Sequence, residues 1–257
     1  MSGQIIILTS FGSADEKIRS STIDALAGEI QKNFPTFDFA QAYTSNFMIK
    51  KLKSKGIEIK TLPEKISELR AAGYKKMIVL PSHITPGEEF DYKIKPCAAE
   101  DVEILPPLFD PDLNSDFNKK IVKTVLECFI PAEDEDLILI GHGSPHRHNP
   151  IYENVQTLAD KISEKIHVGV VEPDDTPNFD DVAGRLKNRN TKKILLAPML
   201  FNGGVHLAED IAGEDKNSWK SRLERLNFEV RVNPNGLGNF KKIHALYIER
   251  LERFAKK

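Results

Sequence analysis

The chain has few of the features that mark secreted, membrane-bound or nucleic-acid-binding proteins. It contains only two cysteines, Cys97 and Cys128, and their separation fits no metal or redox motif, so we expect free thiols in a reducing compartment. No run of about 18 apolar residues occurs, which argues against a membrane span. The 36 basic residues are matched by 38 acidic ones, so no basic surplus indicates nucleic-acid binding. We therefore predict a cytoplasmic protein with no membrane or nucleic-acid partner.

The first residues, MSGQIIILTSFGS, also lack the basic segment that opens a signal peptide. Their apolar run is short, and we interpret Ile5–Thr9 as the first strand of a fold. With 257 residues, of which 40% are hydrophobic, the chain is long enough for one large domain or two of ordinary size.

The stretch from Leu137 to His148, LILIGHGSPHRH, lies at the centre of the predicted fold. Leu137–Ile140 is an apolar run that stops at glycine and proline, the pattern of a buried strand in a parallel sheet. In open α/β sheets, ligands bind outside the carboxyl ends of the strands. We therefore expect His142 at a ligand-binding edge, where the flanking glycines leave its imidazole exposed.

Two later stretches also end in residues that can bind a metal. The run VGVVE reaches Glu172, and ILLAPMLFNGGVH reaches His206. Alone, each residue has an ordinary explanation, as a turn histidine or a solvated loop carboxylate. Together, two imidazoles and a carboxylate that leave coordination positions open suit Fe(II), Co(II), Ni(II) or Zn(II). No local motif such as HExxH supports this metal site at His142, Glu172 and His206, so the prediction depends on the fold.

The order of segments in the first half recurs in the second. LILIGHGS matches IIILTSFGS, VGVVEPDD matches FDFAQAYTSN, and KKILLAPMLFNGG matches KKMIVLPSHITPG. Helices predicted over residues 16–34 and 152–166 follow the first strand of each half. Because alternating strands and helices favour parallel sheets, we predict an α/β protein of two similar parallel-sheet halves with a cleft between them. The halves are residues 1–130 and 131–257, joined at the polar segment IPAEDED.

The first half offers polar groups at matching positions, although it lacks a complete metal-binding set. Two loops precede predicted helices, whose N-terminal N–H groups favour carboxylates or phosphates. These loops contain Ser10, Phe11, Gly12 and Ser13 in the first half and Ser144 in the second. His83 and Glu89 are further candidates for the substrate site. The alternative for Glu88 and Glu89 is a pair of carboxylates at a helix start.

The remaining histidines have simpler interpretations. His146 and His148 resemble a small metal tract, but we expect an exposed loop before the next helix. His167 and His244 are interpreted as ordinary helix-end or helix-surface residues, and Trp219 as a packing residue at a helix start.

Several motifs in the same order resemble those of a known family. They are SFGS near the start, AYTSNFMIKKL, LPSHITPGEEFD, GHGSPHRHNPIYE and HLAEDIAGEDKNSWKSRL. Through nearly its whole length the chain resembles the anaerobic sirohydrochlorin cobaltochelatases of the CbiK type, which belong to the class II chelatases. The resemblance implies two α/β halves around a tetrapyrrole cleft, with the metal held in the second half by His142, Glu172 and His206.

The implied activity is insertion of Co(II), the substrate metal, into sirohydrochlorin in anaerobic cobalamin synthesis. No motif requires a nucleotide or a redox cofactor, and members of this family form small homo-oligomers. Two alternatives stay open: a chelatase for Fe(II) or Ni(II), because affinity order alone does not select cobalt, and a non-catalytic tetrapyrrole or metal carrier.

Overall fold

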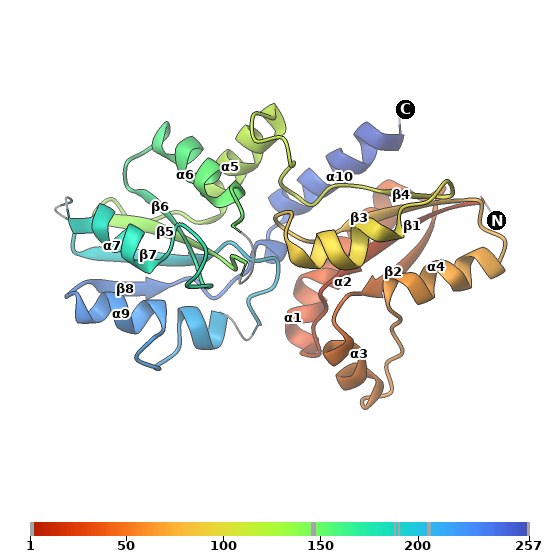
Figure 1. Cartoon of the computed structure of the whole chain (residues 1–257), viewed down its shortest axis with the longest axis horizontal. Helices are drawn as coiled ribbons and strands as arrows, with labels where there is room; N and C mark the ends of the chain where they lie inside the picture. Colours follow the sequence, from red (N-terminus) through yellow and green to blue (C-terminus); the bar gives the residue numbers. More distant parts are fainter. Residues whose placement is uncertain (1–2, 145–147, 188, 190, 205–206, 256–257) are drawn as a thin grey trace. The chain divides into compact units, whose positions relative to one another are not determined.

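The computed structural model describes residues 3–144, 148–187, 189, 191–204 and 207–255. The chain divides into two compact units (Figure 1). Unit 1 comprises residues 1–111 and 244–257, and unit 2 comprises residues 112–243. Each unit is an α/β fold with its own four-stranded sheet.

Unit 1 contains a parallel sheet with the strand order β2-β1-β3-β4. In chain order its elements are β1 (Gln4–Ser10), α1 (Glu16–Ser21), α2 (Ile23–Asn33), β2 (Asp38–Tyr43), α3 (Asn46–Lys53), α4 (Leu62–Ala71), β3 (Lys76–Pro81), the π-helix η1 (Phe90–Ile94), the 3-10 turn η2 (Lys95–Cys97) and β4 (Val102–Ile104). The central strand β1 is apolar from Ile5 to Leu8, and these four side chains are buried. Such a run is typical of a strand covered on both faces.

Unit 2 repeats this arrangement with the strand order β6-β5-β7-β8, again all parallel. In chain order its elements are α5 (Asp116–Cys128), β5 (Glu135–Gly141), α6 (Ile151–Asp160), β6 (Ile166–Val170), α7 (Phe179–Lys187), β7 (Lys193–Pro198), the π-helix η3 (Leu207–Ile211), α9 (Trp219–Arg225), β8 (Glu229–Val232), the 3-10 turn η4 (Leu237–Asn239) and the start of α10 (Lys241–Ala255). All seven residues of β5 are buried. The predicted fold class, with two similar parallel sheets, is therefore confirmed.

Both units build their cores from the same kinds of contact. In unit 1, Ile7 and Val79 of the sheet pack with Ile66 of α4 and Phe90 of η1. In unit 2, Ile140 and Leu196 of the sheet belong to one cluster with Trp219, the first residue of α9. Trp219 is 3% exposed, which confirms the packing residue that the sequence predicts at a helix start.

The helix predicted over residues 16–34 is two helices, α1 and α2, with a break at Thr22. Thr22 is buried, and its hydroxyl donates a hydrogen bond of 2.6 Å to the carbonyl of Ile18. Threonine side chains that bond to the backbone in this way compete with regular helical bonding. The apolar spacing continues across Thr22, which is why the periodicity alone predicts one helix.

The second predicted helix, 152–166, ends earlier, because α6 stops at Asp160 and β6 begins at Ile166. His167 is therefore a strand residue rather than a helix-end residue, and its side chain is completely buried. His244 lies in α10 but is only 3% exposed, so it is not a surface residue either.

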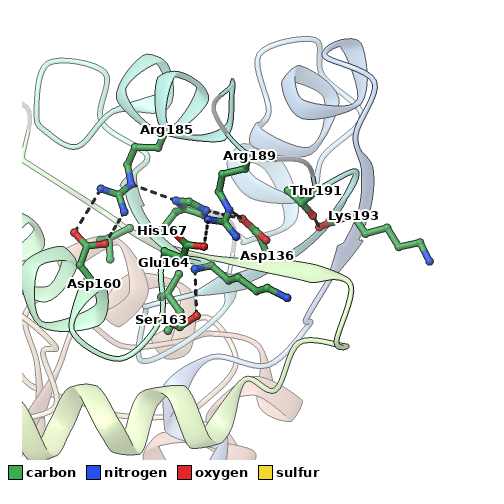
Figure 2. A network of polar contacts seen from close by, with 12 residues as sticks. Asp136, Asp160, Ser163, Glu164, His167, Arg185, Arg189, Thr191 and Lys193 are labelled. Atoms are coloured by element: carbon green, nitrogen blue, oxygen red, sulfur yellow. Dashed lines mark hydrogen bonds and ion pairs between the residues drawn. The ribbon is translucent and has the colours of Figure 1, made fainter.

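A polar network surrounds the buried side chain of His167 (Figure 2). Its Nε2 lies 3.0 Å from Asp136 of β5, and its Nδ1 accepts a hydrogen bond of 3.3 Å from Arg185. Arg189 donates to the same Asp136 carboxylate. Asp136 belongs to the segment predicted as a polar linker, yet it is 1% exposed and paired inside unit 2.

The two units do not meet at residue 130, the boundary predicted from the sequence, because two helices belong to the other unit than expected. Helix α5 belongs to unit 2, where Glu127 pairs with Lys242 and the ring of Phe129, just after the helix, packs on Phe240. Most of α10, coloured blue in Figure 1, belongs to unit 1. The Tyr247 hydroxyl donates to the Ser82 carbonyl at 2.7 Å, and Arg250 pairs with Asp110 at 2.7 Å and donates to the Leu108 carbonyl at 2.6 Å. The C-terminal helix therefore completes the N-terminal unit.

Candidate active site

Unit 2 brings two of the predicted metal-binding residues together. His142 follows β5 directly, and Glu172 follows the neighbouring strand β6 after one residue. The backbone N–H of Glu172 donates to the carbonyl of His142 at 2.9 Å, so the pairing of the two strands continues into the loops. The Nδ1 of His142 lies 3.8 Å from Oε1 of Glu172, and both side chains are partly exposed. This pair was predicted from the strand ends.

Glycines on both sides of His142 are required by close contacts. Gly143 has a φ of +82°, and a Cβ there would lie 3.0 Å from the Cβ atoms of Glu172 and Val170. At Gly141, a Cβ would lie 2.1 Å from the ring of Tyr152. Glycine alone fits this backbone conformation and leaves room for the neighbouring side chains. The two glycines of the GHG motif therefore allow His142 to lie close to Glu172.

Asp175 organises the loop after β6, and sequence reasoning missed it. Its buried carboxylate accepts hydrogen bonds from the backbone N–H groups of Ser144, Asn149 and Thr176 at 2.9, 3.2 and 2.8 Å. The Nδ1 of His148 lies 2.9 Å from the same carboxylate, while the His148 side chain is 47% exposed. Ser144 lies in a loop predicted to hold an anionic group of the substrate, and its N–H donates to this internal side chain. The run of proline and two aspartates after Glu172 is the signal that could have drawn attention to Asp175.

The third predicted ligand, His206, lies outside the described residues, as does His146. In the sequence His206 immediately precedes η3, whose first residue is Leu207. Among the residues that are described, no three histidine, cysteine, aspartate or glutamate side chains gather as a metal-binding group. The described part of the predicted triad is therefore the pair His142 and Glu172.

In unit 1, the loops at the carboxyl ends of the strands are joined by hydrogen bonds. The hydroxyl of Ser82, just after β3, donates to the hydroxyl of Ser10 at the end of β1, at 2.8 Å. The N–H groups of Thr44 and Ser45 donate to the carbonyls of Ser10 and Phe11 at 2.9 and 3.3 Å. Ser10 is therefore buried in a contact that fixes the edge of the sheet, and Phe11 beside it is 44% exposed.

The loop from Ser10 to Ser13 does not present an open helix terminus to an anion. The Ser13 hydroxyl accepts from the N–H of Asp15, and the Asp15 carboxylate caps α1 by accepting from Ile18 at 3.0 Å. Gly12 has a φ of +105°, and a Cβ there would lie 2.4 Å from the ring of Tyr43. The backbone of this loop is thus fixed by its own contacts.

His83 and Glu89 form a second group at the carboxyl end of the unit 1 sheet. Both ring nitrogens of His83 are buried and have no hydrogen-bond partner among the described residues, and the same is true of Oε2 of Glu89. Burial of the ring lowers the pKa of His83 to about 4, although the nearby charge of Glu89 opposes this shift and Lys93 adds to it. Oε1 of Glu89 accepts from Nζ of Lys93 at 2.6 Å.

Orphaned buried nitrogens and oxygens are rare in proteins, and each needs an explanation such as a ligand or water that completes the bonding. At neutral pH the His83 ring is uncharged. One nitrogen then carries a proton and the other a lone pair, so His83 can both donate and accept a hydrogen bond.

Two solved structures share the fold of the whole chain. SirB from Bacillus subtilis with Fe3+ superposes with a TM-score of 0.61 at 13% identity, covering 98% of this chain and 95% of SirB. CbiX, the terminal enzyme for biosynthesis of siroheme in denitrifying bacteria, superposes with a TM-score of 0.56 at 15% identity, covering 97% of this chain and 98% of CbiX. These likenesses agree with the two-unit α/β fold predicted from the sequence.

The family model for cobalt chelatase (CbiK) matches residues 4–256, and the chain belongs to this family. Two curated relatives are similar over most of their length. One is the sirohydrochlorin cobaltochelatase of Salmonella typhimurium, 25% identical over 257 residues, or 96% of this chain and 95% of the relative. The other is the sirohydrochlorin cobaltochelatase CbiKC of Nitratidesulfovibrio vulgaris, 27% identical over 225 residues, or 85% and 79%. Co(II) is accordingly the substrate metal of the family. Among the described residues, no helix has the length and apolar character needed to cross a membrane.

Proposed function

We propose that this chain inserts Co(II) into sirohydrochlorin, with His142, Glu172 and His206 holding the incoming ion. The observation that carries the proposal is the separation of 3.8 Å between the His142 ring and the Glu172 carboxylate at adjacent strand ends. Nitrogen and oxygen ligands bind such ions at about 2.1 Å, so two donors on one ion can lie up to about 4.2 Å apart. The pair is thus spaced for one shared cation.

Either neutral tautomer of His142 supplies a lone pair to the ion. Its Nδ1 lies 3.2 Å from the carbonyl of Gly143, which accepts the proton when Nδ1 carries it, and Nε2 is then the metal-binding nitrogen. In the other tautomer, Nδ1 and Glu172 can bind the ion together. Three protein ligands leave positions open for the pyrrole nitrogens, which take over the metal stepwise.

Two protons must leave the pyrrole nitrogens as the metal enters. The side chains of Glu172 and Glu89 are the acceptors we propose, because a carboxylate oxygen can take a proton as the metal's positive charge arrives. His83, with its pKa of about 4, is a poor base at neutral pH. We propose that it binds the ring by hydrogen bonding through the nitrogens that lack partners in unit 1.

The test is anaerobic absorbance of sirohydrochlorin with catalytic amounts of protein and Co(II), Fe(II) or Ni(II) in turn. We expect many turnovers, fastest with Co(II). If turnover were fastest with Fe(II) or Ni(II), that ion would be the substrate metal in place of Co(II). A spectral change that stops at one ring per protein would identify a carrier instead of an enzyme.

The variant His142→Ala separates metal handling from ring binding. We expect it to abolish insertion and to bind sirohydrochlorin with nearly unchanged affinity, because the lost imidazole acts on the ion. Wild-type turnover in this variant would remove His142 from the mechanism.

A further inference from the structure

Unit 1 contains a cavity of about 690 Å³, and Lys93, one of its lining residues, donates to Glu89. It lies at the carboxyl end of β2, between the start of α4 and the turns η1 and η2. Its lining includes Thr44, Tyr92, Lys93, Cys97 and Ala98. Cavities of roughly 300–1,000 Å³ are the usual size of small-molecule sites.

The cavity is basic. Lys93 and Arg70 line it, and none of the described residues that line it is an aspartate or glutamate. Arg70 is held by Asp101 in two hydrogen bonds of 2.7 Å, and Lys93 is paired with Glu89 at 2.6 Å, with neither carboxylate among the lining residues.

The equivalent place in unit 2 has the opposite charge. A cavity of about 840 Å³ lies there against the end of β6, the start of α7 and the π-helix η3. Its lining includes Glu209, Asp210, Glu214 and Asp215. Counted from the first residue of each π-helix, Asp210 occupies the position of Lys93. Duplicated sites of opposite charge are suited to different ligands, and the basic one is suited to an anion.

A buried hydroxyl marks where the anion would bind. Thr44 is 6% exposed, lines the cavity, and its Oγ1 has no hydrogen-bond partner among the described residues. The Nζ of Lys93 lies 3.4 Å from the carbonyl of the same residue. An ammonium group has three donors, so Lys93 can keep Glu89 and still bind a further oxygen.

We propose that this cavity receives a carboxylate-bearing corner of the tetrapyrrole, with Lys93 and the Thr44 hydroxyl donating to one carboxylate. The inference rests on the proposed function, because the ring is its substrate. Tyr92, 70% exposed at the cavity, provides an aromatic surface for the apolar edge of the ring. Because Lys93 also binds Glu89, the cavity anchors the ring beside a proposed proton acceptor.

The first experiment places a charge in the cavity. Ala98 is exposed and lines it, so Ala98→Glu adds a carboxylate and Ala98→Gln adds the same bulk without charge. Binding of sirohydrochlorin is titrated without cobalt. We expect Ala98→Glu to raise the dissociation constant about fivefold, because one like charge at a few ångströms in a hydrated site has about this effect. Ala98→Gln should change the dissociation constant less than twofold.

The second experiment uses the two thiols as reporters. Cys97 lines the cavity, and Cys128, in α5 of unit 2, is the internal control. Alkylation at alkaline pH is followed by mass spectrometry. We expect sirohydrochlorin to slow modification of Cys97 but not of Cys128, and citrate at the same concentration to leave both rates unchanged.

Each failure has its own meaning. Equal affinities of the two Ala98 variants, or no protection of Cys97 by the ring, would overturn the inference while cobalt insertion could still stand. Protection by citrate but not by the ring would assign the cavity to a free acid instead. If the ring bound as expected but no cobalt were inserted, the cavity would still be assigned to the ring, and the proposed function would be wrong.

Discussion

Replacing Gly143 by alanine tests whether the approach of His142 to Glu172 matters for metal insertion. Gly143 has a φ of +82°, and an added Cβ would lie 3.0 Å from the Cβ atoms of Glu172 and Val170. Gly56 has a similar φ of +76°, but nothing lies within 4 Å of a Cβ there. The pair of substitutions therefore separates backbone strain from the contact with Glu172.

The strain should be the same at both positions. A left-handed backbone costs an alanine about 1–2 kcal/mol, so both variants should lose roughly this much free energy of unfolding. At Gly143, relief of the contact must also move Glu172 or Val170 by a few tenths of an ångström. Because a displacement of about 1 Å at a catalytic group can cost about a hundredfold in rate, we expect kcat/KM of Gly143→Ala to fall about tenfold.

The assay combines urea unfolding with anaerobic cobalt insertion into sirohydrochlorin. We expect Gly143→Ala to lose at least as much stability as Gly56→Ala, because it adds the contact to the same strain. Activity should fall only in Gly143→Ala, with Gly56→Ala within twofold of wild type. Wild-type kcat/KM in a folded Gly143→Ala protein would refute the reasoning, because insertion would then not depend on the separation of His142 and Glu172.

Two further predictions concern buried side chains that can carry a charge. Asp136→Asn removes a carboxylate that is 1% exposed and paired with His167 and Arg189, so we expect a loss of about 3–5 kcal/mol in urea unfolding. Asp134→Asn, which breaks an exposed pair with Lys193, should cost less than about 1 kcal/mol, and equal losses would contradict the role of burial. For His83, burial lowers the folded pKa to about 4, below the unfolded value, so the unfolded chain binds more protons as pH falls below about 6.5 and stability declines. Between pH 7 and 5 this amounts to about 2 kcal/mol, and unfolding of His83→Gln should lack this part of the pH dependence.

The sheets could be predicted from the sequence because they depend on local patterns. Apolar runs such as Ile5–Leu8 and Leu137–Ile140 are fully buried strands, and the repeated order of segments implies two parallel sheets. The break at Thr22 was missed because the apolar periodicity continues across it. The partners that bury Asp136 come from β6 and the segment after α7, so nothing local distinguishes it from a linker carboxylate.

The candidate site was predicted where it follows directly from a strand end, as for His142 and Glu172. Asp175 was missed because its role depends on N–H groups from three separate positions that converge only in the fold. The anion-binding role expected for Ser13 overlooked the competing use of its hydroxyl by Asp15. Short-range chemistry of this kind decides which predicted polar groups are left for a ligand.

The placement of α10 has a consequence for how the protein is made. Unit 1 is built from two segments, on either side of unit 2 in the sequence, and it needs Tyr247 and Arg250 of the second segment to bind the Ser82 carbonyl and Asp110. Unit 2 is continuous from residue 112 to 243 and is complete earlier in synthesis. We therefore expect unit 2 to be able to fold as a unit before unit 1, whose contacts are complete only when α10 has been made.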